Sequence, residues 1–204
     1  MGMRTASQPC NTISTKRAGF TLLEVMVVAA ISMIIAMIAV PNMITVISNM
    51  RLRSSMTSLA GVLQNCRMLA VKQNEVMTTH FAVSTYGMAN GVIAYVKLAS
   101  DPNPVSTTDS QVQLEQPVTQ VPSLSGPDAP STAPSLGFTA QTGSPSFTTT
   151  GLPCAYSGGN CTNSGFVYYF HDTRSSSRTG WASISISPAG RLKKWYWNGQ
   201  TWTD

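Results

Sequence analysis

A long apolar segment close to the amino terminus is the feature that most constrains how this chain can fold. Residues 25–40 are all apolar except Ser32, and no charged residue occurs between Val25 and Asn49. A helix over residues 20–40 rises about 1.5 Å per residue and therefore reaches across the roughly 30 Å hydrocarbon core of a bilayer. The sequence predicts that residues 20–47 form the membrane-spanning half of a helix.

The positive charge of the chain is concentrated ahead of this segment. The net charge is +5, and Arg4, Lys16 and Arg17 all precede the apolar residues. The positive-inside rule therefore places residues 1–19 in the cytoplasm and the residues after the span in the periplasm, as a single pass through the inner membrane. Only 10% of the residues are charged, which argues against a coiled coil or a protein coated with basic residues for binding nucleic acid.

Two simpler interpretations of the segment account for it less well. A secretory signal peptide has an apolar core of about 7–15 residues followed by a small-residue cleavage site, whereas here Gly19 precedes a longer run. A plain membrane anchor leaves Glu24 unexplained, because a carboxylate inside a membrane helix costs a few kcal/mol unless it is neutralised. Cleavage after Gly19 would create a charged amine on Phe20 that neutralises Glu24 of the same or a neighbouring subunit.

The residues Gly19-Phe20-Thr21-Leu22-Leu23-Glu24-Val25 resemble the processing site of the type IV pilin and pseudopilin superfamily. The resemblance implies that a prepilin peptidase removes residues 1–19 by cutting between Gly19 and Phe20, and that it methylates Phe20. It also implies that Glu24 acts in filament assembly and that Pro41 bends the helix. The simpler interpretation of Pro41 is that it marks the exit from the membrane.

After Pro41 the apolar residues recur every three or four positions, which is typical of one face of an amphipathic helix. We expect this half of the helix to cover residues 48–74, to end near Gln73 and Asn74, and to pack against a sheet. The apolar face consists of Leu52, Met56, Leu59, Leu63, Cys66 and Ala70.

Residues 75–204 predict a β-rich periplasmic head, so the expected fold class is α+β, with one long helix packed on an antiparallel sheet. Expected strands cover residues 76–83 and 91–98, which form a hairpin, then 165–170, 181–187 and 191–197, with a short one after Asn198 and Gly199.

The composition changes over residues 99–153, which hold nine of the twelve prolines. Dense prolines interrupt sheet ladders. We expect a long variable loop there, with one or two short strands near residues 111–115 and 147–149.

The four cysteines have different predicted states. Cys10 leaves with the leader, and Cys66 lies on the buried helix face as a free thiol. Cys154 and Cys161 face an oxidising periplasm, which favours a disulfide between them. Their separation does not suit a zinc knuckle and no histidine lies near them in the sequence, so no metal and no other cofactor is expected.

Within the superfamily, two segments narrow the resemblance. Residues 48–73 are similar to the helix of the GspH/FimT group of minor pseudopilins, and residues 187–192 resemble the strand-turn-strand of that group, with Trp195 and Trp202 fitting its aromatic ending. The first similarity covers about the first third of the chain, the second is short, and residues 99–164 resemble no known segment.

This resemblance implies a structural subunit of a type II secretion pseudopilus or a type IV pilus that helps to initiate or cap the filament. Its implied partners are other pilin or pseudopilin subunits, the inner-membrane assembly platform and prepilin peptidase. After assembly the subunit would lie in a periplasmic or surface filament.

The alternative function is DNA binding during uptake, as implied for the FimT side of the group through a Gly-Arg-x-Arg motif. This chain has Gly190-Arg191-Leu192-Lys193-Lys194 followed by Trp195, so that Lys193 stands where the second arginine would be. Lysine keeps the charge but loses the planar fork of arginine. Alternation along a strand puts Arg191 and Lys193 on one face and Lys194 on the other. The opposing interpretation is an exposed strand end whose aromatic residues pack on the core.

Arg174 and Arg178 are the residues expected to supplement this basic cluster. An enzyme is not expected, because neither of the two histidines, His80 and His171, has a carboxylate or nucleophile at a recognisable catalytic spacing. The adjacent Asp172 would point to the opposite face of a strand from His171.

Overall fold

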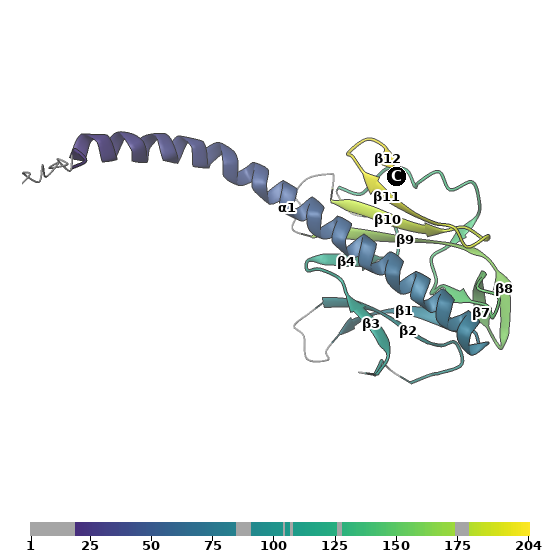
Figure 1. Cartoon of the computed structure of the whole chain (residues 1–204). Coiled ribbons are helices and arrows are strands. Elements are labelled where there is room, and N and C mark those ends of the chain that lie inside the picture. The colour runs from purple at the N-terminus through teal and green to yellow at the C-terminus, as the bar shows by residue number, and fades with distance from the viewer. Residues whose placement is uncertain (1–18, 85–90, 104, 107, 126–127, 174–179) are drawn as a thin grey trace, which may run out of the picture. The chain divides into compact units, whose positions relative to one another are not determined.

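The computed structural model describes residues 19–84, 91–103, 105–106, 108–125, 128–173 and 180–204. The chain forms two compact units, Met1–Pro41 and Asn42–Asp204. The helix α1 (Leu22–Gln73) contributes residues to both units, and the remaining elements are strands of the second unit (Figure 1). The predicted α+β fold, a long helix on antiparallel sheets, is confirmed.

Local hydrogen bonds define both ends of α1. The Thr21 hydroxyl accepts a hydrogen bond from the Glu24 backbone N–H at 3.2 Å, as an N-cap residue does. At the other end Asn74 has a φ of 54°, and the Glu75 N–H donates to the Ala70 carbonyl at 3.2 Å. This left-handed residue with its backward hydrogen bond is a Schellman ending. The helix therefore ends where the sequence predicts.

The predicted apolar face of the helix is buried in the second unit. Every one of its six residues is at most 2% exposed. Val62, at 3% exposure, joins this face although the spacing pattern did not include it. Burying one large aliphatic side chain contributes roughly 1.5–3 kcal/mol, so this face holds the helix to the head.

Two antiparallel sheets form the rest of the second unit (Figure 1). The first has the order β3-β2-β1-β6-β7-β8, and the second has the order β12-β11-β10-β9-β4, with β5 paired in parallel to β9. The strands of the first sheet are β1 (Met77–Ser84), β2 (Gly91–Leu98), β3 (Ser110–Gln113), β6 (Ser146–Phe147), β7 (Pro153–Ser157) and β8 (Asn160–Asn163). Those of the second are β4 (Val118–Val121), β5 (Ala140–Gln141), β9 (Gly165–Asp172), β10 (Trp181–Ile186), β11 (Leu192–Trp197) and β12 (Trp202–Thr203).

The two predicted hairpins are present. β1 pairs with β2 from Met77↔Leu98 to Ser84↔Gly91. β10 and β11 are joined by a turn in which Gly190 has a φ of 81° and donates its N–H to the Ser187 carbonyl at 2.7 Å. A positive φ of this size favours glycine, which accounts for the residue at this turn.

Both sheets contribute to one core beneath the helix. Tyr168 and Phe170 of β9 are buried, and the ring of Phe81 in β1 lies 5.0 Å from the ring of Tyr168 between centroids. Phe147 of β6 and Phe166 of β9 are each 1% exposed in the same core. The part of α1 after residue 41 crosses both sheets in Figure 1, so its apolar face joins them.

The prediction for residues 99–153 needs correction. The described residues of this segment contain four short strands, β3, β4, β5 and β6, where one or two were expected. The strands near residues 111–115 and 147–149 are present as β3 and β6, whereas β4 and β5 were missed. The sequence also gave no sign of β7 and β8 on either side of Cys154 and Cys161. These strands are two to five residues long. β4 and β5 pair with the longer strand β9, whereas β7 and β8 pair with each other as a hairpin that β7 attaches to β6, so tertiary pairing rather than their own propensity accounts for them.

Candidate functional site

The predicted processing segment lies just ahead of the helix. Gly19, Phe20 and Thr21 are not helical, and the Phe20 side chain is 82% exposed. A Cβ atom added to Gly19 would meet no atom within 4 Å, so no packing within the chain requires glycine there. An exposed, non-helical peptide bond after a glycine is the form of chain that a peptidase can bind. Any requirement for glycine at this position therefore comes from a peptidase that binds this segment.

Apolar side chains cover the first part of α1 on all sides. Large hydrophobic residues such as Leu22, Met37 and Ile38 are more than 70% exposed. Among the described residues, one helix, α1, is long and apolar enough to cross a membrane. Exposed apolar surface on this scale indicates a lipid or protein environment.

The two polar residues discussed for this part, Ser32 and Glu24, differ in whether their side chains form hydrogen bonds within the helix. The Ser32 hydroxyl donates to the Val28 carbonyl at 2.8 Å, so it needs no water. The Glu24 carboxylate is exposed and has no hydrogen bond or ion pair within the part of the chain that the structure describes. Glu24 is thus an exposed carboxylate among apolar side chains, with no partner among the described residues.

The helix changes from exposed to buried at Ser48, in the second unit. Ile47 is 40% exposed, whereas Ser48 is 7% exposed and its hydroxyl donates to the Asp172 carboxylate of β9. Asp172 is fully buried. Local sequence patterns do not reveal this hydrogen bond, because the two residues lie 124 positions apart.

A second pair of contacts extends this attachment by two turns. The Ser55 hydroxyl accepts from the Glu115 N–H at 3.0 Å, and the Ser54 hydroxyl donates to a Glu115 carboxylate oxygen at 3.0 Å. Three serines of the helix therefore fix it to two different segments of the head.

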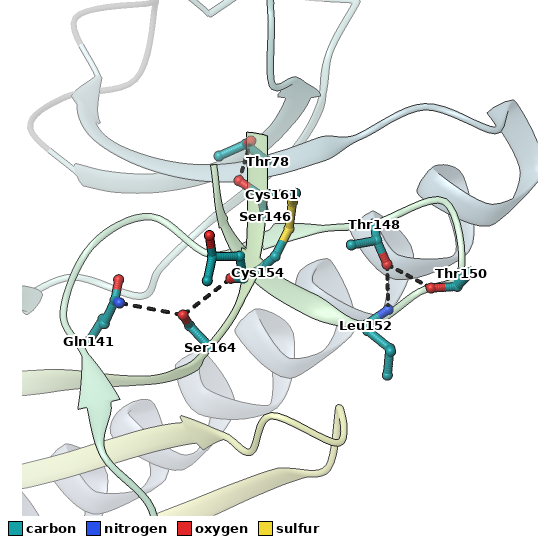
Figure 2. The surroundings of a disulfide bond; sticks show 10 residues. Thr78, Gln141, Ser146, Thr148, Thr150, Leu152, Cys154, Cys161 and Ser164 are labelled. Carbon is teal, nitrogen blue, oxygen red and sulfur yellow. Dashed lines mark hydrogen bonds between the residues drawn. A yellow bond between two sulfur atoms is a disulfide. The ribbon is translucent and has the colours of Figure 1, made fainter. Parts of the chain in front are cut away.

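The predicted disulfide joins Cys154 and Cys161 across the β7–β8 hairpin, with Cα atoms 5.4 Å apart (Figure 2). Gly158 and Gly159 make the turn between these strands with φ values of 58° and 86°. Figure 2 also shows Ser164, which follows β8, between Gln141 and the hairpin, where it accepts from the Gln141 amide at 3.4 Å. The disulfide therefore joins the two strands of the hairpin, the pairing of β7 with β6 attaches it to the edge of the first sheet, and the Gln141 contact links the residue after it to β5 of the second sheet.

The predicted state of Cys66 is confirmed as well, whereas Cys10 lies outside the described residues. Cys66 is free and fully buried, and burial raises the pKa of its thiol to about 12. A thiol with so high a pKa carries almost no thiolate at neutral pH, and the thiolate is the reactive form. No group of three metal-ligating side chains occurs among the residues that the structure describes.

The basic strand end has the two faces that the sequence predicts. Lys193 and Trp195 lie opposite Ser185 and Ser183 of β10, on the face away from α1, and the Trp195 Nε1 donates to the Ser185 hydroxyl at 2.8 Å. Lys194 points to the other face, where its Nζ lies 3.5 Å from the Thr57 hydroxyl of α1.

Lys193 already has partners. Its Nζ lies 2.6 Å from an Asp204 carboxylate oxygen and 4.5 Å from the centroid of the Trp195 ring. The hydrogen bond from Lys193 lowers the pKa of the Asp204 carboxyl. Arg191 is exposed and makes no ion pair among the described residues. Arg174 and Arg178, the expected supplements to this cluster, lie outside the described residues.

Both histidines have structural surroundings. The His80 ring stacks on Tyr95 at 5.4 Å, and burial followed by the charge of Lys97 lowers the pKa of His80. The His171 ring stacks on Trp181 at 4.5 Å, and burial lowers the pKa of His171. Both shifts favour the neutral imidazole, and both rings stack on an aromatic side chain.

Comparison with known proteins gives one match. The family described as "Prokaryotic N-terminal methylation motif" matches residues 14–40, a range that includes Gly19, Phe20 and Glu24. The chain therefore carries a type IV pilin-like signal for processing by prepilin peptidase and for assembly with other pilin subunits. No curated protein and no solved structure matches the chain.

Proposed function

We propose that this chain is a minor pilin or pseudopilin of the GspH/FimT kind, a structural subunit of a type II secretion pseudopilus or a type IV pilus. The observation that carries the proposal is the division of α1. Its first part exposes apolar side chains all round, and its second part buries one face against the head. The first part suits a bilayer before assembly and the helices of other subunits afterwards.

The proposed processing follows from the motif at residues 14–40. Prepilin peptidase cuts between Gly19 and Phe20 and methylates the new amine of Phe20. Glu24 lies four residues after Phe20, so the two groups share a side of the chain if the helix extends to the new amino terminus. The amine then neutralises Glu24 of the same subunit or of its neighbour. Because this pairing forms at one axial offset, it sets the register of the helices.

The proposed topology places the head in the periplasm and the leader in the cytoplasm. Lys16 and Arg17 support it through the positive-inside rule. The disulfide supports it independently, because disulfides persist in oxidising compartments. The inner-membrane assembly platform would then withdraw the helix from the membrane, with Pro41 as the position where it bends. A role in starting or capping the filament rests on the resemblance to minor pseudopilins.

Filament incorporation tests this proposal. The chain is expressed in a bacterium that assembles such filaments, and surface filaments are sheared off and probed for the head. We expect the subunit in the sheared fraction of the wild type and its absence when Gly19 is replaced by a large residue that blocks processing. A subunit that reaches the filaments without processing would contradict the proposal.

DNA binding, the alternative, has less support from the geometry of the basic strand end. Lys193 is paired with Asp204, and Lys194 is turned toward α1. Among the described cations of the cluster, only Arg191 has no ion pair and is not turned toward α1. Each phosphate contact adds roughly −0.9 to the salt slope on duplex DNA, so we expect a slope near −1 for this arrangement instead of the −2 to −3 of a full cluster.

A further inference from the structure

The face of the second sheet that points away from α1, here called the outer face, is rich in aromatic side chains. Residues alternate between the two faces of a strand, and the register of β10, β11 and β12 puts all four tryptophans of the chain on the outer face. The Trp202 ring lies across the strands, with its centroid 5.5 Å from that of Trp197 and 6.5 Å from that of Tyr169. The outer face is thus a continuous aromatic surface.

Residues 128–138, here called the strap, cross this outer face, and their course beside β11 and β12 can be followed in Figure 1. The Trp202 Nε1 donates a hydrogen bond to the Thr132 carbonyl at 2.6 Å. Farther along the strap, Leu136 and Phe138 lie across a groove of about 380 Å³ from Trp195. The strap is therefore held at Trp202 and stands away from the sheet at Trp195.

Two prolines form the buried part of the strap. Pro130 and Pro134 are buried, whereas Ser131, Thr132 and Ser135 are exposed. Residues 129–138 form neither helix nor strand, so regular pairing does not occupy their carbonyl groups. Extended proline-rich chain that docks on aromatic side chains is a common mode of peptide recognition, because proline loses little conformational freedom on binding. The strap therefore shows which kind of ligand the outer face accepts.

The strap leaves polar atoms of the outer face unsatisfied. The Trp181 Nε1, the His171 Nε2 and the Ser183 Oγ are buried and have no hydrogen-bond partner among the described residues. Trp181 is 2% exposed and Ser183 is fully buried. Buried polar atoms without partners cost free energy, so the strap covers the face without completing its hydrogen bonds. A proline-rich chain has many free carbonyl acceptors and few N–H donors, which suits the donors of Trp181 and Ser183.

We infer that the outer face is a binding site for an extended, proline-rich segment of another filament subunit, and that this segment displaces the strap. Its prolines pack on the tryptophan rings, and its carbonyls accept hydrogen bonds from Trp181 and Ser183, as the Thr132 carbonyl does from Trp202. The groove beside Trp195 gives the incoming segment its first contact. The inference rests on the proposed filament role only for the source of the segment.

Two features favour a peptide over a nucleic acid, whose bases could also stack on tryptophan rings. The strap is itself a peptide, and the face already recognises one of its carbonyls through Trp202. The unsatisfied donors of Trp181 and Ser183 carry no charge that would attract phosphates. A nucleic acid therefore lacks the acceptor pattern that a proline-rich chain offers.

Peptide binding to the processed full chain in detergent micelles tests the inference. The probe is a ten-residue peptide of alternating alanine and proline, and the matched probe has serine in place of each proline. Titration calorimetry measures the affinity, and tryptophan emission reports the location because all four tryptophans lie on the outer face. We expect the proline peptide to bind and to shift the emission, and the serine peptide to bind roughly tenfold more weakly.

Variants of the strap test whether it competes with the peptide. Pro130→Ser/Pro134→Ser should tighten binding of the proline peptide roughly three- to tenfold, because the apparent affinity scales with the fraction of molecules in which the face is free. A misfolded variant would not show such a gain for the proline peptide alone. Ser131→Ala changes an exposed strap residue between the two prolines and is the matched control, with unchanged affinity.

A variant of the face tests the predicted hydrogen bond. Trp181→Phe keeps an aromatic ring beside His171 and removes the Nε1 donor. It should weaken binding roughly three- to tenfold, the effect of one hydrogen bond. No binding to the strap variant, equal binding of both peptides, or full affinity of Trp181→Phe would each overturn the inference. Because incorporation through α1 is measured separately in sheared filaments, these results leave the proposed function standing.

Discussion

At the scale of single residues, two polar side chains mark the two different tasks of α1. Glu24 lies exposed among apolar residues and has no partner within the described part of the chain. Ser48 lies buried, with its hydroxyl on the carboxylate of Asp172. We propose that the first residue pairs with the amine of a cleaved amino terminus, whereas the second attaches the helix to its own head. Each therefore has a separable effect when it is replaced.

Glu24→Ala should impair filament incorporation while leaving membrane insertion intact or improved. The substitution removes a carboxylate that costs a few kcal/mol in the bilayer, and it also removes the partner of the Phe20 amine. Membrane fractionation and the sheared-filament assay measure the two effects. Glu75→Ala, which removes an exposed carboxylate beyond the end of the helix, is the matched control. Incorporation of the Glu24 variant at the wild-type level would refute the assembly role.

Ser48→Ala should lower the free energy of unfolding of the head by about 1–3 kcal/mol, because it takes a hydrogen bond from a buried carboxylate. Ser54→Ala, which loses an exposed hydrogen bond to Glu115, should cost under about 0.5 kcal/mol. Denaturant unfolding of the full chain in detergent measures both. Equal losses of unfolding free energy in the two variants would mean that the buried hydrogen bond to Asp172 stabilises the head no more than the exposed one to Glu115.

At the scale of elements, long periodic segments could be predicted and short paired ones could not. Both ends of α1, its buried face and the β1–β2 hairpin follow from local patterns of residues. By contrast, β4 and β5 lie in a proline-rich segment and form because β9 supplies their partners. No local pattern reveals which distant strand a short segment joins.

In the candidate site, too, some features follow from the local sequence and others depend on distant contacts. Gly19, Phe20 and Glu24 form a contiguous motif, so the sequence is sufficient to find them. The alternation of Arg191, Lys193 and Lys194 also follows from strand geometry. The Lys193–Asp204 ion pair depends on the return of the chain along β11, and the contact between Phe138 and Gly165 depends on how the segment before β5 packs. These contacts required the tertiary structure.

Gly165→Ala tests how the segment before β5 is held against β9. A Cβ atom at Gly165 would overlap the Phe138 ring, so the ring must move. Overpacking of this kind typically costs about 1–3 kcal/mol. Gly143→Ala is the matched control, because a Cβ there meets nothing within 4 Å. Thermal unfolding should show a lower Tm for the first variant alone, and equal Tm values would argue against this packing.

At the scale of the whole molecule, the two units have separate requirements for stability. The head, Asn42–Asp204, has its own core, formed by the second part of α1 and both sheets, and a disulfide at one edge. The apolar part of α1 has no such core within the chain and must be covered by lipid or by other subunits. In a subunit that moves from a membrane into a filament, this apolar part would be covered in both places, first by lipid and then by the other subunits.

The amino-terminal residue of the mature protein tests this account most directly. The chain is produced together with a prepilin peptidase, purified from membranes or sheared filaments, and its amino-terminal peptide is analysed by mass spectrometry. The account predicts a chain that begins at Phe20 and carries one methyl group on its amine. An intact Met1, or a cut after the apolar segment as a signal peptidase would make, would contradict it.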